Sequence, residues 1–176
     1  MSDADEERAA LIERLRQGVD TWFGAHGADE MQAAMVETAF LMAAADGRID
    51  PSEYDELVST LARVTGQTMS IDRIRIIGSQ LMELLRQEGW DSRLAAVANA
   101  IPSPHSRRSA FMLAAGVAFI DGVVQPEEAQ LFGLLANRFE IPMQEAEMLM
   151  HEVHRSLFDG GQELTQPVIL LTRFRG

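Results

Sequence analysis

The sequence contains no cysteine and no lysine, and these two absences limit its chemistry. Without cysteine, disulfides and thiolate chemistry are excluded. Without lysine, all 15 basic residues are arginines. Two explanations are open, the GC-rich codon usage of a bacterium or a need for bidentate pairing with carboxylates, and we favour codon usage.

Long apolar runs and enzyme motifs are also missing. No run of roughly eighteen apolar residues occurs, so we expect no membrane-spanning helix. The acidic start, MSDADEERAA, lacks the pattern of a secretory signal, and we therefore expect a cytoplasmic protein. The sequence has no nucleophile elbow, Walker loop or dinucleotide fingerprint, so we expect no enzyme.

Negative charge dominates the chain. The 176 residues carry a net charge of −12, which repels nucleic acid and anionic lipid unless one face is segregated, and we expect no nucleic acid as a partner. Residues 67–110 are the exception, because their arginines could form a small basic patch: Arg73, Arg75, Arg86, Arg93, Arg107 and Arg108. A hydrophobic fraction of 47% is enough to fill the core of one domain.

Apolar residues recur at helical spacing almost throughout, which predicts an all-α, single-domain bundle of seven to eight helices. The apolar stripes begin near Leu11, Met31, Tyr54, Ile71, Leu94, Phe111, Leu131 and Met143. A strand-like pattern occurs only at residues 168–171. We therefore expect an acidic N-terminal helix in residues 1–28, a helical domain in residues 29–158 and a C-terminal tail in residues 159–176.

A twelve-residue block occurs twice. Residues 43–54 read AAADGRIDPSEY and residues 118–129 read AFIDGVVQPEEA, so that Asp46 and Asp121 lie 75 residues apart. Each block stands between an Ala-rich apolar run and a segment of helical spacing. The pattern predicts a duplicated helix–loop–helix with an acidic joint between its helices.

Much of the joint can be explained by residues that begin or end a helix. Asp50, Pro51 and Glu53 fit the N-cap, first and third positions of a helix, which together make a capping box. Asp46 and Asp121 are different, because each would end a helix, where a carboxylate opposes the helix dipole. Their partners could be the free N–H groups of the next helix, an arginine or a cation, and these explanations stay open.

A cation would need both blocks. The segment from Asp46 to Glu53 matches the second half of an EF-hand loop, but Met42 and Ala44 occupy its first and third ligand positions, so a self-contained EF-hand is excluded. Two facing repeats could still pool their carboxylates, from Asp46, Asp50, Glu53, Asp121, Glu127 and Glu128. Oxygen ligands alone would suit Ca²⁺, Mg²⁺ or Mn²⁺.

The two blocks in register resemble the TerB-like (tellurite-resistance protein B) family over residues 30–155. The resemblance implies an all-α bundle with an internal pseudo-twofold axis, and a non-enzymatic adaptor or sensor in a bacterial stress-response or membrane-associated complex. It implies a protein partner and allows peripheral membrane association through partners. The family's proposed metal ligands correspond to Asp46, Asp50, Glu53, Asp121 and Glu128. Gln125 departs from the pattern where the first block has Asp50. The alternative is a structural interaction module without a metal.

Two further segments remain. Glu147, His151 and His154 share one helical face and could bind a transition metal, although exposed helical histidines are commoner. The tail, PVILLTRFRG, is apolar and then basic. It either docks into a groove of its own bundle, which we favour, or serves as a short motif for a partner or membrane surface.

Overall fold

The computed structural model describes residues 2–23, 29–44, 49–66, 69–120 and 126–158, which form eight helices and no strand. The helices are α1 (Asp3–Phe23), α2 (Asp29–Ala43), α3 (Pro51–Val64), α4 (Ile71–Glu88), α5 (Trp90–Ala100), α6 (Pro104–Ile120), α7 (Pro126–Arg138) and α8 (Met143–Phe158). The predicted all-α fold is confirmed for these residues. The strand-like residues 168–171 lie outside them.

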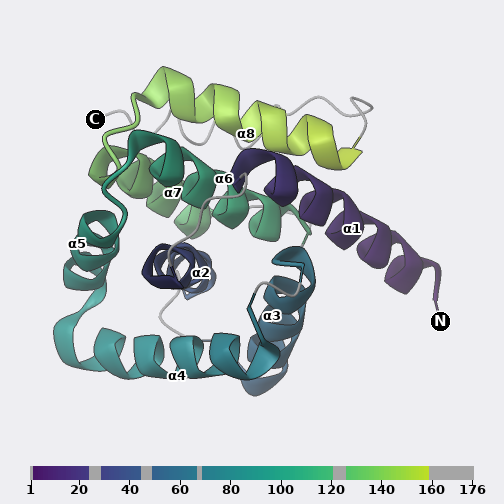
Figure 1. Cartoon of the computed structure of the whole chain (residues 1–176), viewed down its shortest axis with the longest axis horizontal. Helices are drawn as coiled ribbons and strands as arrows, with labels where there is room; N and C mark the ends of the chain where they lie inside the picture. The colour runs from purple at the N-terminus through teal and green to yellow at the C-terminus, as the bar shows by residue number, and fades with distance from the viewer. Residues whose placement is uncertain (1, 24–28, 45–48, 67–68, 121–125, 159–176) are drawn as a thin grey trace.

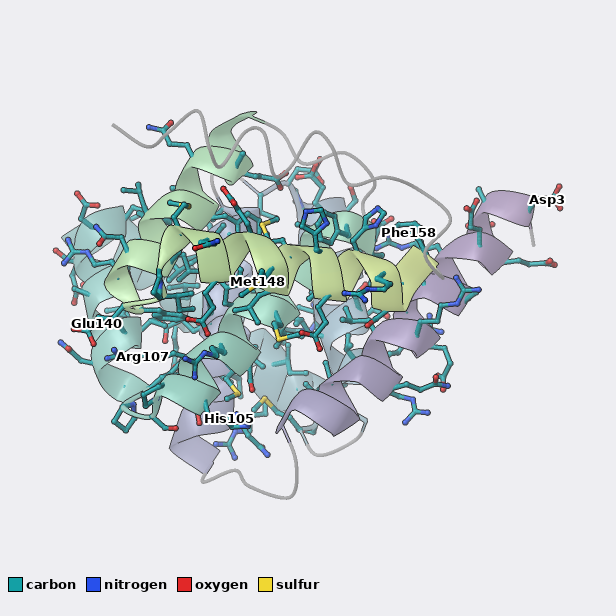
Figure 2. All side chains as sticks on the ribbon, turned by 90° about the horizontal axis from the view of Figure 1, so that it is seen from above. Asp3, His105, Arg107, Glu140, Met148 and Phe158 are labelled. Atoms are coloured by element: carbon teal, nitrogen blue, oxygen red, sulfur yellow. The ribbon has the colours of Figure 1, made fainter. Side chains whose placement is uncertain are left out.

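Helix α2 occupies the middle of the bundle. Figure 1 shows it end-on, with α5, α4 and α3 around it and the remaining helices above. Its most extensive packing is against α6. Helix α1 lies along the upper layer, and its N-terminal end, marked by Asp3, projects beyond the other helices (Figure 2).

The two halves of the chain are interlocked. Helix α1 packs on α3 but also on α6 and α8, which belong to the second half. Helix α5, in turn, packs on α7 and on α2 and α4 of the first half. Each half therefore contributes one helix that covers apolar surface of the other.

The core is built from α2 and α6 because both are apolar on nearly every side. Every residue of α6 from Ser109 to Ile120 is buried. Phe40 of α2 and Phe111 of α6 are fully buried, and burial of such a side chain contributes about 1.5–3 kcal/mol. Helix α1 approaches closely at Gly116, where an added Cβ would lie 2.3 Å from Leu15 Cδ1. A glycine is therefore needed at this crossing.

Candidate functional site

The structure describes the first acidic joint from residue 49 onward, and Asp50 directly precedes α3. Asp50 has extended backbone angles, with φ −73° and ψ 160°. Its Oδ1 accepts hydrogen bonds from the backbone N–H groups of Ser52 (2.8 Å) and Glu53 (3.1 Å) and from the Ser52 hydroxyl (2.7 Å). Glu53 Oε2 accepts from the Asp50 N–H at 3.2 Å. The predicted capping box is confirmed.

These hydrogen bonds keep the Asp50 carboxylate charged. The Ser52 hydroxyl, followed by the Glu53 and Ser52 backbone N–H groups, lowers the pKa of Asp50 below its ordinary value of 3.8. Pro51 at the first helical position has no N–H to satisfy, which suits this geometry. The cap thus fixes the entry of α3 and orients one acidic side chain of the joint.

The five predicted metal ligands are only partly covered by the structure. Asp46 and Asp121 lie outside the described residues. Glu128 is half-buried in the first turn of α7. Within the described ranges, no three His, Asp or Glu side chains come together as a metal-binding group. Asp50, Glu53 and Glu128 therefore do not assemble the pooled site by themselves, and that hypothesis depends on Asp46 and Asp121.

The histidines of α8 differ in their surroundings. His151 is exposed, whereas His154 is half-buried against two aromatic rings. The His154 ring lies edge-on to Phe119 of α6, with centroids 5.4 Å apart, and tilted against Phe158 at 4.5 Å. Burial, and then the charge of His151, lowers the pKa of His154 below 6.5. The ring of His154 thus takes part in the packing of α8 on α6.

The arginines of residues 67–110 do not form a free basic patch. Arg75 pairs with Asp55 at 2.6 Å, Arg86 pairs with Glu83, and Arg108 pairs with Glu145. Arg93 pairs with Glu37 and, at 3.4 Å, with Glu88. The positive charge that the sequence concentrates here is therefore largely neutralised by carboxylates from neighbouring helices or turns.

Arg107 shows a role that the sequence alone did not reveal. Its Nε donates to the Ile101 carbonyl at 2.7 Å and its Nη2 to the Ala98 carbonyl at 2.9 Å, which satisfies the C-terminal end of α5. Its Nη1 reaches Glu140 Oε2 at 3.2 Å. Figure 2 shows Arg107 and Glu140 on the same side of the molecule. The planar guanidinium spreads its N–H donors over three nitrogens, so that this one side chain reaches three separate acceptors.

An open hollow of about 370 Å³ lies between α5 and α7. The residues that line it are Asp91 and Leu94 of α5, Leu134, Asn137 and Arg138 of α7, and Glu140 just beyond α7. The hollow is thus lined by two carboxylates, one guanidinium, one amide and two leucines. No motif marks this hollow in the sequence, because its residues come from segments about forty positions apart.

No family model matches this sequence, and no curated protein or solved structure is detectably similar to it. Among the described helices, none has the length and apolar character needed to cross a bilayer. The case for a function therefore depends on the residues of the chain itself.

Proposed function

We propose that this protein is a TerB-like, non-enzymatic adaptor or sensor that works in a bacterial stress-response or membrane-associated complex. The observation that carries the proposal is the register of the two acidic blocks. Helices α3 and α7 begin at Pro51 and Pro126, 75 residues apart, and α2 and α6 begin at Asp29 and Pro104, at the same offset. The two repeated sequence blocks thus coincide with repeated helix boundaries.

The packing of the helices supports an internal pseudo-twofold axis. Exchange of α1–α4 with α5–α8 turns the α2–α4 contact into the α6–α8 contact, both of which occur. The same exchange turns the contacts of α5 with α2, α4 and α7 into those of α1 with α6, α8 and α3. Such correspondence is expected when two copies of one helical unit have been joined.

In this proposal, the paired acidic joint binds a divalent cation such as Ca²⁺, Mg²⁺ or Mn²⁺. The ligands would be Asp46, Asp50, Glu53, Asp121 and Glu128. Five carboxylates near one another repel, and a bound cation relieves that repulsion. Binding to the folded state alone then raises stability, by about 2.7 kcal/mol at a hundredfold excess over Kd.

The second candidate is a structural protein-interaction module without a metal. The hydrogen bonds of Asp50 favour it, because its Oδ1 is already engaged by three donors. In this module, the carboxylates of the joint would serve only to begin and end helices. Either candidate acts through a protein partner, so co-purification of the full chain from its native host would test the shared part of both.

A cation titration separates the two candidates. We expect millimolar Ca²⁺, Mg²⁺ or Mn²⁺ to raise the melting temperature, and Asp46→Asn or Asp121→Asn to remove most of the rise. Asp72→Asn, at an exposed first-turn position of α4, is the matched control and should keep it. NaCl at equal ionic strength accounts for simple screening of the −12 charge. Equal melting temperatures in the two salts would leave only the structural module.

A further inference from the structure

The hollow between α5 and α7 contains two opposite charges that do not pair with each other. Asp91 and Arg138 both line it, yet within the described residues neither makes an ion pair or a side-chain hydrogen bond. This contrasts with the neighbouring Arg107, which binds two carbonyls and Glu140. Both side chains are exposed, so each is open to a charged group of a ligand that enters the hollow.

The same hollow has an apolar side. Leu94 is fully buried beneath it, with 1% of its surface exposed, whereas Leu134 remains 41% exposed. Leu134 is one of four large hydrophobic side chains that are exposed in the described part of the chain. A ligand with an aliphatic group could therefore cover Leu134 while its charged groups reach the polar residues.

The rim of the hollow is held in an unusual conformation. Glu140 has φ 58°, in the left-handed region where glycine is normally found. Its N–H donates to the Asn137 carbonyl at 3.1 Å, and the following N–H of Ile141 donates to the Ala136 carbonyl at 2.8 Å. These two hydrogen bonds form the C-cap of α7, which fixes the backbone at the rim of the hollow.

We propose that this hollow binds a small zwitterion, a free α-amino acid with an aliphatic side chain. Asp91 would accept hydrogen bonds from the ligand's ammonium group, and Arg138 would bind its carboxylate, helped by the Asn137 amide. The aliphatic side chain would lie against Leu134, which is exposed. The volume of about 370 Å³ falls within the range of small-molecule sites. This inference does not depend on the cation site or on the TerB-like resemblance.

Isothermal titration of the full-length protein with L-leucine tests the proposal. We expect saturable binding of L-leucine and at least about tenfold weaker binding of 4-methylpentanoate, which lacks the ammonium, and of 3-methylbutylamine, which lacks the carboxylate. Binding of the carboxylate alone with equal affinity would overturn the role of Asp91. The absence of saturable heat with L-leucine, L-valine and L-isoleucine would overturn the whole site.

Single substitutions test which residues of the hollow bind L-leucine. Arg138→Gln and Asp91→Asn should each weaken L-leucine binding by at least about tenfold, because each leaves one ligand charge unpaired. Arg86→Gln is the matched control, since Arg86 is an exposed arginine outside the hollow, and it should bind L-leucine normally. Leu134→Trp should block the hollow without altering its charges. Unchanged affinity in Arg138→Gln, with the helical signal intact, contradicts the proposal.

Discussion

At the scale of single residues, Asp50 and His154 each have a local structural role. Asp50 illustrates this, because one of its oxygens organises the first turn of α3. The same hydrogen bonds lower its pKa and so link the cap to pH. A residue that the sequence suggested as a metal ligand thus has a measurable structural role that can be tested without any metal.

We expect Asp50→Ala to lower the melting temperature by a few degrees, because the N–H groups of Ser52 and Glu53 lose their acceptor. The loss should already appear without added Ca²⁺, where the cap alone is tested. Asp50→Asn should retain most of the stability, since Asn is also a good N-cap. Thermal unfolding followed by circular dichroism measures all three proteins, and an unchanged Asp50→Ala would refute the capping role.

The cap should also have a pH signature. The pKa of Asp50 is lower in the folded than in the unfolded chain, so its contribution is fully present above about 3.8 and is lost as pH falls through the folded value. We expect the stability advantage of the wild-type protein over Asp50→Ala to shrink below that pH. Denaturant titrations across the acidic range check this, and a constant difference between the two proteins would argue against it.

His154 should respond at higher pH and with the same sign. Burial and His151 lower its pKa below 6.5, so the folded state disfavours the proton that the unfolded state accepts. Stability is then fully present above about 6.5 and falls as pH drops through the folded pKa. His154→Phe, which keeps a ring against Phe119 and Phe158, should remove this loss. Denaturant titrations of the two proteins across this pH range measure the difference.

At the scale of helices, the absence of a side chain at Gly116 lets α1 pack closely against α6. A Cβ at Gly116 would lie 2.3 Å, 3.0 Å and 3.2 Å from three carbons of Leu15, and Leu15 is itself fully buried. The side chain of Leu15 therefore has no free space to move into. Gly133 of α7 is a contrasting helical glycine, since the nearest atom to its Cβ would be Met143 Cε at 3.9 Å.

These two glycines give a matched pair of substitutions. Gly116→Ala should destabilise the protein by about 1–3 kcal/mol, because the added methyl overpacks the α1–α6 contact. Gly133→Ala should be neutral or stabilise by about 0.5–1 kcal/mol, because alanine restricts the unfolded chain and fits the helix. Urea unfolding measures both free energies. Similar values for the two variants would show that α1 does not pack as described.

At the scale of the whole molecule, the interlocked halves should not fold alone. Helix α1 covers α6 and α8, and α5 covers α2 and α4. A chain cut at Gly89 separates each of these helices from most of its partners. We expect residues 1–88 and 90–176 to be poorly folded separately and to regain a cooperative melting transition when mixed. Cooperative unfolding of residues 1–88 as a monomer would contradict the interlocked packing.

The sequence predicted local features well and tertiary features poorly. Helical spacing predicted all eight described helices, and the letters of Asp50, Pro51 and Glu53 predicted the capping box, because both depend on neighbours within a few residues. The role of Arg107 could not be predicted, since it depends on where α5 ends relative to α6. The hollow at Asp91 and Arg138 was missed for the same reason.

The burial of α6 determines when its amide hydrogens become exposed to solvent. Because every side chain from Ser109 to Ile120 is covered by other helices, no local fraying can expose the middle of this helix to water. Its amide hydrogens should exchange with deuterium only when the bundle unfolds as a whole. The exchange rate of the Ala114 and Ala115 amides would then report the global free energy of unfolding, whereas the projecting first turns of α1 should exchange within the time of mixing.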